Sequence, residues 1–265
     1  MEISGFALGV LIGVTLGLIG SGGSILAVPT LVYVVGVMPS LATTYSLFVV
    51  GISALVGCLK GFKDKLINYK LALFFGLPSL FSILVMRRFI LPMLPQEFQV
   101  AGYAIPKDFL IMLVFSVLML LASWSMIKST NDSQESDESL INFLDIAIKG
   151  IAVGLLTGFV GVGGGFLIIP TLVFSAKLPM KNAVATSLIV IAGNALMGFL
   201  GSLKQSPIDW YFLLSFTLCA VLGIGVGMYL NSKLSHEKLK PAFGWFVLFT
   251  GIYIIVRETW HFWVA

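Results

Sequence analysis

Ten long apolar runs, separated by charged residues, proline or glycine, dominate the pattern of the chain. They cover roughly residues 3–20, 24–36, 40–59, 69–91, 108–127, 141–160, 165–176, 182–203, 210–231 and 241–260. Within each run the apolar character is continuous, whereas a membrane β-barrel would need short strands that alternate apolar and polar positions. Because a membrane-spanning helix needs about 20 apolar residues, the pattern predicts an all-α, polytopic helical membrane protein.

The composition supports this prediction. Hydrophobic residues make up 58% of the chain and charged residues only 11%, and no Asp, Glu, Lys or Arg occurs from Ile3 through Leu59. A soluble domain carries about 25% charged residues, so lipid must cover most of this protein's surface. No Lys or Arg precedes the first run, which carries Glu2 instead, and we therefore interpret it as a retained helix and not as a signal peptide.

An internal duplication divides the chain. The segment Gly17–Gly23 recurs as Gly158–Gly164 at an offset of 141 residues, and over residues 17–69 the two copies share 19 identities in 53 ungapped positions. Each copy holds five apolar segments, an odd number, so the second must enter the membrane from the opposite side. We therefore expect two inverted-topology repeats, at residues 1–127 and 141–265, joined by a cytoplasmic linker at 128–140.

The second segment of each repeat, 24–36 or 165–176, is short for a spanning helix. It is interpreted as a broken helix or as half of a re-entrant hairpin, and the sequence leaves both open. Either alternative returns the chain to the same side, so the expected topology does not depend on the choice.

The basic residues fall unequally on the two sides of this arrangement. One side has eleven: Lys60, Lys63, Lys65, Lys70, Lys128, Lys149, Lys177, Lys181, Lys233, Lys238 and Lys240. The other has five: Arg87, Arg88, Lys107, Lys204 and Arg257. The positive-inside rule then places both termini outside a cell (inner) membrane. Basic residues strung singly between apolar runs form no patch, so the net charge of +4 does not indicate nucleic-acid binding.

Both repeats carry a glycine-rich break at the same depth. Glycine leaves the backbone bare, and the N–H groups at the start of the next helix point partial positive charge at whatever lies there, so the breaks are candidate anion-binding sites. The candidate residues are Gly20, Ser21, Gly22, Gly23 and Ser24 in the first repeat and Gly161, Gly163, Gly164 and Gly165 in the second. Close helix packing is the alternative role for these glycines.

Hydroxyl and amide side chains in the third segment of each repeat are the next candidates, because they donate to an anion without the cost of burying a fixed charge. They are Thr43, Thr44 and Ser46 in the first repeat and Thr186, Ser187 and Asn194 in the second. Ser46 and Ser187 occupy equivalent positions. Bonds back to their own helical turn are the alternative role of such side chains.

Ionisable residues are expected only near the ends of the segments, as loop or interface groups. Cys58 and Cys219 lie far apart in apolar segments and fit no disulfide or zinc spacing. We therefore expect no cofactor, no metal and no enzymatic activity. The longest soluble stretch expected between segments, about 20 residues between Arg87 and Lys107, is too short for a domain.

The paired motif of Gly17, Gly20, Gly22 and Gly23 with Pro29, repeated as Gly158, Gly161, Gly163 and Gly164 with Pro170 and followed by Ala185-Thr186-Ser187-Leu188, resembles the TauE/SafE sulfite exporter family over nearly the whole chain. The resemblance implies an inner-membrane permease for sulfite, sulfoacetate or related sulfur anions, with both breaks and the regions of Ser46 and Ser187 lining the pathway. The first copy departs from the pattern at Ser24 and at Tyr45.

Together these features predict a permease for a small anion, with sulfite, an organosulfonate or a related sulfur anion as the substrate, working by alternating access of two inverted repeats. A membrane scaffold subunit that does not transport and a membrane-embedded enzyme are the alternatives. The expected partners are the small anionic substrate and the lipid bilayer, without nucleic acid, and the sequence is compatible with a homo-oligomer.

Overall fold

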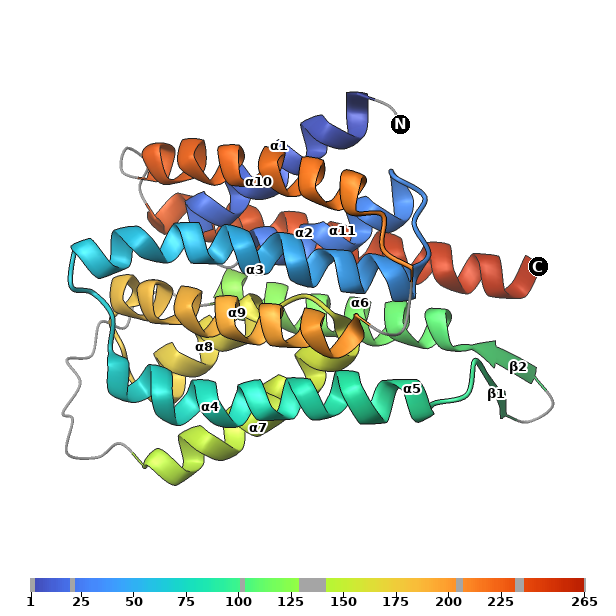
Figure 1. Ribbon diagram of the computed structural model, residues 1–265, viewed down its shortest axis with the longest axis horizontal. Helices are drawn as coiled ribbons and strands as arrows, with labels where there is room; N and C mark the ends of the chain where they lie inside the picture. The colour runs from blue at the N-terminus through green and yellow to red at the C-terminus, as the bar shows by residue number, and fades with distance from the viewer. Residues whose placement is uncertain are drawn as a thin grey trace.

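The computed structural model describes residues 3–19, 22–100, 103–128, 142–203, 207–231 and 236–264 (Figure 1). Each of the ten predicted segments forms a helix, so the all-α polytopic fold class is confirmed. The helices of the first half are α1 (Ile3–Ile19), α2 (Gly22–Tyr33), α3 (Pro39–Lys63), α4 (Tyr69–Val85), η1 (Met86–Ile90), α5 (Leu91–Met93) and α6 (Lys107–Lys128). Those of the second half are α7 (Phe143–Val160), α8 (Gly165–Ser175), α9 (Met180–Ser202), α10 (Trp210–Asn231) and α11 (His236–Val264).

Six of the described helical spans are long and apolar enough to cross a membrane. They are Pro39–Lys63, Tyr69–Met93, Lys107–Trp124, Phe143–Val160, Lys181–Ser202 and Trp210–Leu230. Large apolar side chains such as Phe81, Leu121 and Tyr211 are exposed on their outer faces. Such a surface is stable only in contact with lipid, so the chain is a multi-pass membrane protein.

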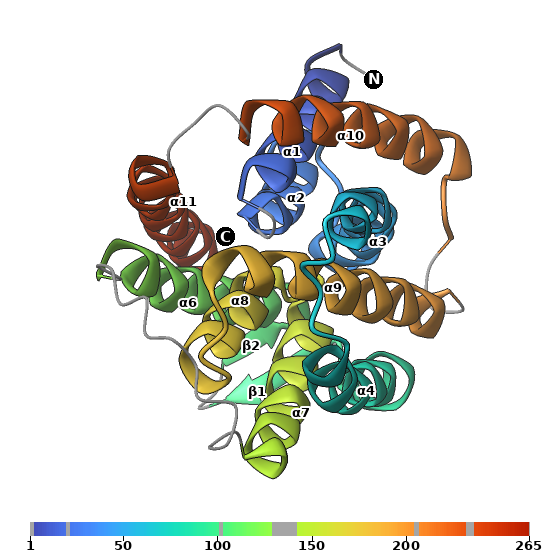
Figure 2. The same ribbon diagram turned by 90° about the vertical axis from the view of Figure 1, so that its left-hand side faces the viewer.

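The α3 and α9 helices form the centre of the bundle. Seen along the bundle axis, they lie together with α2 and α8, while α1 with α10, α4 with α7, and α6 with α11 lie around them (Figure 2). In an apolar 18-residue stretch of each helix, 72% of the residues are buried in α3 and 67% in α9. In the helix Tyr69–Met93 the buried share is only 33%. The site predicted on the third segments is therefore in the protein interior.

Equivalent glycines pack two of the three outer helix pairs, α1 with α10 and α4 with α7. On α1, a Cβ at Gly13 would overlap the carbonyl of Ala220 on α10; on α7, a Cβ at Gly154 would overlap the carbonyl of Ser79 on α4. The offset of 141 maps Gly13 onto Gly154 and Ser79 onto Ala220. Small residues at these positions let the helix backbones approach closely.

The contacts between the two central helices, α3 and α9, are reciprocal in the same way. Gly57 on α3 faces Leu188 on α9, and Gly198 on α9 faces Leu47 on α3, which are the equivalent positions of the opposite halves. Two repeats related by a twofold axis would give such reciprocal contacts. Their insertion in opposite directions stays a prediction.

The fourth helices of the two halves begin in equivalent ways. The α4 helix is capped by the Asn68 side chain, whose Oδ1 accepts from Leu71 N–H at 3.1 Å, and Asp209 Oδ1 accepts from Phe212 N–H at 3.0 Å at the start of α10. Both cap residues precede the first apolar turn, where four N–H groups need acceptors. The equivalence therefore extends to the start of the fourth helix of each half.

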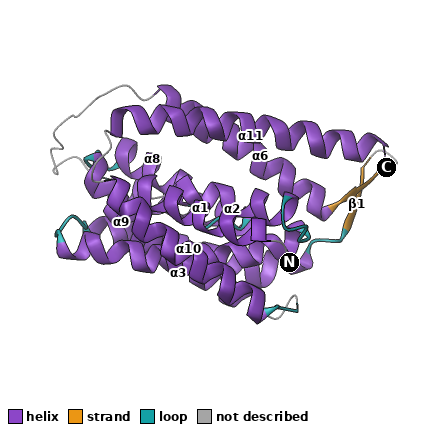
Figure 3. Ribbon diagram, turned by 90° about the horizontal axis from the view of Figure 1, so that it is seen from above, coloured by secondary structure: helices purple, strands orange, loops and turns teal. Residues whose placement is uncertain are grey.

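The region between α4 and α6 differs from the prediction. The helix continues through the π-helical turn η1 and α5 to Met93, so Arg87 is inside the helix and not at the start of a soluble stretch. Beyond it, β1 (Glu97–Val100) pairs with β2 (Tyr103–Pro106) in an antiparallel hairpin. Figure 3 shows this hairpin at one end of an otherwise helical bundle. Four-residue strands carry too little alternation to be predicted from sequence.

Candidate functional site

The second glycine-rich break connects α7 to α8 through three left-handed glycines. Gly161, Gly163 and Gly164 have φ values of +78°, +69° and +81°. Other residues adopt this conformation only at a cost, whereas glycine reaches it freely. The Gly161 N–H donates to Thr157 O at 2.8 Å and closes the last turn of α7. The sequence therefore ends one helix and starts the next within the bundle.

The start of α8 presents bare backbone. Gly164 is its N-cap residue and supplies no side-chain cap. Within the described part of the chain, no carbonyl accepts from the N–H groups of Val162, Gly163 or Gly164. Because the first N–H groups of a helix lack internal acceptors and carry partial positive charge, this position is electropositive.

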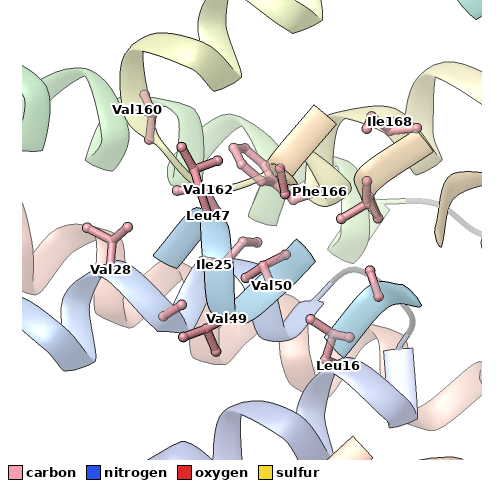
Figure 4. Close-up of a cluster of buried hydrophobic side chains, with 14 of the residues drawn as sticks. Leu16, Ile25, Val28, Leu47, Val49, Val50, Val160, Val162, Phe166 and Ile168 are labelled. Atoms are coloured by element: carbon pink, nitrogen blue, oxygen red, sulfur yellow. The ribbon is translucent and has the colours of Figure 1, made fainter. Parts of the chain in front are cut away.

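The break lies against the crossing of α3 and α9. A Cβ at Gly163 would be 3.0 Å from Val50 Cγ1 and 3.3 Å from Ala195 Cβ. Figure 4 shows Val162 of the break among buried side chains of α3 and α8. The two central helices, one from each half, therefore enclose the break, and the side chains that meet Gly163 are apolar.

Thr43 and Arg87 meet the first glycine of the break. A Cβ at Gly161 would overlap both Thr43 Cβ and Arg87 Nη2. Arg87 Nη1 donates to Thr43 Oγ1 at 3.2 Å, and Thr43 Oγ1 donates to Ser40 O at 2.8 Å. Thr43 is in the second turn of α3, and Val50 lies about 10 Å further along at about 1.5 Å per residue. The break thus runs from the level of Arg87 to the middle of α3.

Arg87 is the functional candidate that the sequence analysis missed. Its side chain is only 1% exposed, whereas the neighbouring Arg88 is exposed. The expectation that Arg87 lies among loop or interface charges was therefore wrong. It belongs to the π-helical turn η1, and such turns are rare and frequent at functional sites. The signal was present in the predicted run 69–91, which includes Arg87 and continues through the apolar residues Phe89, Ile90 and Leu91.

Lys107 is a second correction. It is only 8% exposed, and its Nζ donates at 2.6 Å to the carbonyl of Leu91, the first residue of the short helix α5. This bond connects the first residue of α6 to the far end of the α4–α5 helix. The amine therefore satisfies a helix C-terminus and is not one of the exposed loop or interface charges that the sequence analysis expected.

The candidates Ser24, Thr44, Ser46 and Gly165, in α2, α3 and α8, are interior. Ser24 and Ser46 are 0% exposed and Thr44 is 3% exposed. Thr44 Oγ1 donates to Ser40 O at 3.3 Å, which is a bond within its own helix. Ser46 Oγ has no hydrogen-bond partner among the described residues. Gly165 is buried at the start of α8.

The candidates on α9 make different contacts. Thr186 Oγ1 accepts from Asn68 N–H at 3.0 Å, and Ser187 Oγ donates to Val184 O at 2.8 Å. Asn194 Nδ2 donates to Ser79 Oγ on α4, and its Oδ1 has no partner among the described residues. Thr186 and Asn194 thus contact α4 or its N-cap rather than the break, and a binding role for them stays a prediction.

The first break is described only in part. Gly20 and Ser21 lie outside the described residues. Gly22 and Gly23 form the beginning of α2, so a helix starts there at the position equivalent to the second break. Whether the two breaks form one site stays a prediction.

These features define a multi-pass helical membrane protein with a broken helix enclosed at its centre. Residues 5–254 match the family described as Sulfite exporter TauE/SafE. The chain belongs to this family, and it is a membrane transporter.

Relatives across most of the chain have matching names. A probable membrane transporter protein of Xylella fastidiosa (strain Temecula1 / ATCC 700964) is 30% identical over 256 residues, covering 94% of this chain and 93% of its own. One from Methanocaldococcus jannaschii is 28% identical, covering 88% of this chain and 87% of its own. The probable membrane transporter protein YunE of Bacillus subtilis is 26% identical, covering 88% and 89%. No solved structure matches the chain significantly.

Proposed function

We propose that this transporter is a permease for a small anion and that its substrate is sulfite, an organosulfonate or a related sulfur anion. The observation that carries the proposal is the break at Gly161–Gly164, where an uncapped helix start is buried against both central helices. Buried N–H groups at a helix start favour a negative ligand. The name of the family supports sulfur anions as the first substrates to test.

The mechanism proposed is alternating access of the two repeats. The site is built from both halves, because Gly161 and Gly163 belong to the second and Thr43 and Val50 to the first. The reciprocal contacts at the offset of 141 supply two similar packing arrangements. A rocking movement of one half against the other would then expose the break to one side or the other.

The orientation proposed has both termini outside the inner membrane. Arg87 and Lys107 are buried in protein, so neither acts as a surface charge on the side that has fewer basic residues. Without these two the sequence count on that side falls from five to three, against eleven on the other side. The asymmetry that the positive-inside rule uses is therefore larger than the sequence count suggested.

A two-stage experiment tests the function. Sulfite, thiosulfate, sulfonates and carboxylates are first screened for thermal stabilisation of the purified protein, since a ligand at 100 times its Kd adds about 2.7 kcal/mol. Uptake of radiolabelled sulfite into proteoliposomes is then measured with the unlabelled anions as competitors. We expect saturable uptake that one class of sulfur anion inhibits. Absence of flux for every small anion would contradict the proposal, and a stoichiometric partner in such a preparation would favour the scaffold alternative.

A further inference from the structure

We propose that Arg87 is the charged group that binds the transported anion, at a site that it forms with Thr43 and the second glycine-rich break. This inference rests on the proposed permease function. It adds the chemical class of the ligand, a small oxoanion with two oxygen atoms placed to accept from one guanidinium.

The contacts bring a cation to the bare backbone. Arg87 Nη1 is 3.2 Å from Thr43 Oγ1, and Nη2 occupies the place where a side chain at Gly161 would be. The Arg87 Cβ lies 3.0 Å from the Cβ position of Gly201 on α9. The Arg87 side chain is therefore held between α3, α9 and the first glycine of the break, three residues before Gly164, the N-cap residue of α8. A guanidinium at one end of the break and an uncapped helix start at the other both favour an anion in the break.

A buried hydroxyl lies on the same side of α3. Thr43 and Val50 both contact break glycines, and Ser46 falls between them at helical spacings of three and four residues, which places it on the same face. Ser46 is 0% exposed, and its Oγ has no hydrogen-bond partner among the described residues. Buried hydroxyl groups nearly always have partners, so this atom indicates a ligand that completes the site.

The other half shows that the fold does not need the charge. At the offset of 141, Met228 stands at the position of Arg87 and Val184 at that of Thr43. Met228 packs against the same core with its neutral side chain. The second half thus keeps equivalent packing without a cation, so the guanidinium beside Gly161 is a feature of one half only, and we assign it to ligand binding.

The geometry of arginine selects the ligand class. Its planar fork of N–H donors matches two oxygens of one oxoanion, whereas lysine offers a point charge without that fit. Sulfite and sulfonates present such oxygens, and so do carboxylates. A halide presents no pair of oxygens. The site is accordingly specific for oxoanions and is asymmetric between the halves.

The experiment compares three variants of the full-length protein. Arg87→Met introduces the residue of the equivalent position, Arg87→Lys keeps the charge without the fork, and Arg88→Met removes the exposed neighbouring charge as the matched control. Initial rates of radiolabelled sulfite uptake into proteoliposomes give KM and the maximal rate, with chloride and acetate as competitors. Thermal shifts with sulfite measure binding independently of transport.

We expect Arg87→Met to fold, to lose the sulfite-induced thermal shift and to raise KM by about tenfold or more, as loss of a charge-assisted bond predicts. Arg87→Lys should also raise KM, by a smaller factor, while Arg88→Met should leave it within about twofold of wild type. Acetate should compete with sulfite and chloride should not.

Active Arg87→Met with wild-type KM and thermal shift would overturn the assignment of Arg87. If Arg87→Met does not fold, Arg87→Lys decides the question, because an unchanged KM in that variant overturns the assignment as well. Wild-type protein that takes up none of the probes would instead contradict the permease function itself. The uptake rate of the wild type thus tests the permease function, and the ratio of KM between variant and wild type tests the role of Arg87.

Discussion

The two halves of the chain share their helix packing but differ at the position next to the glycine-rich break. Gly13 against Ala220 and Gly154 against Ser79 are the same contact made twice. The pair at the second break, Arg87 with Thr43, has Met228 and Val184 as its counterparts. Duplicated residues thus account for the framework, and the residues that differ carry the proposed chemistry. A symmetric fold can therefore hold an asymmetric site.

The helices that follow the breaks are also held differently at their far ends. On α2, Tyr33 OH donates to Glu258 at 2.7 Å, and the Arg257 guanidinium lies 4.3 Å from the Tyr33 ring centroid. On α8, Ser175 Oγ accepts from Lys149 at 2.8 Å. The α2 helix is thereby fixed to α11, whereas α8 is fixed to α7, its own predecessor.

Leucine at Gly13 or at Gly154 gives the largest expected effect. A Cβ at either position would overlap a backbone carbonyl, and overpacking typically costs about 1–3 kcal/mol even where side chains can adjust. We expect both variants to lose most of the folded protein, measured by size-exclusion chromatography and thermal melting. Gly225→Leu is the control, since nothing lies within 4 Å of its Cβ position. Tolerance of one leucine but not of the other would break the equivalence of the two helix pairs.

The Gly161→Ala substitution, compared with Gly36→Ala, distinguishes the effect of disturbing the site from the effect of backbone strain. Gly161 and Gly36 have nearly the same φ, +78° and +80°, but only at Gly161 would the new Cβ overlap Arg87 and Thr43. Left-handed strain alone costs about 1–2 kcal/mol. We expect both variants to melt earlier and only Gly161→Ala to lose sulfite uptake. Equal uptake by the two would show that the contact with Arg87 is unimportant.

The Thr43→Val substitution gives the first half the residue that the second half has at the equivalent position, Val184. It removes the acceptor of the Arg87 Nη1–H, and hydrogen bonds to charged groups contribute about 1.5–3 kcal/mol. We expect KM for sulfite to rise, because the guanidinium loses its anchor, while Val184→Thr leaves KM unchanged. A rise in KM in both variants would make the two breaks functionally equivalent and refute the asymmetry.

The smallest effects are expected at Tyr45 and Thr186. Their hydroxyls accept from the backbone N–H of Asp209 and of Asn68, at 2.9 Å and 3.0 Å, so both support the start of a fourth helix. Tyr45→Phe and Thr186→Val should each lower stability by about 1 kcal/mol, seen in thermal melting. A change in KM for Thr186→Val alone would instead support the predicted binding role of Thr186.

The sequence predicted the helices because apolar runs bounded by charge and glycine leave few alternatives in lipid. It also predicted the duplication, since glycines such as Gly57 and Gly198 are needed for close packing and therefore recur. It did not predict the burial of Arg87, because an arginine near the end of an apolar run looks like a headgroup anchor. The sequence departs from the repeat at Tyr45, which stands opposite Thr186. In the structure the two hydroxyls make equivalent bonds, because each accepts from the backbone N–H of the residue that caps a fourth helix.

The central claim is that a small anion crosses this protein through the break at the α3–α9 crossing. Sulfite uptake by wild type, Gly163→Leu and the equivalent Gly22→Leu tests it most directly, with Gly225→Leu as the control for a leucine in open space. A Cβ added at Gly163 would lie 3.0 Å from Val50 Cγ1, so a leucine side chain at this position would fill the break. We predict uptake by wild type and Gly225→Leu and none by Gly163→Leu or Gly22→Leu, although both insert in the membrane. Wild-type uptake by folded Gly163→Leu would contradict the claim.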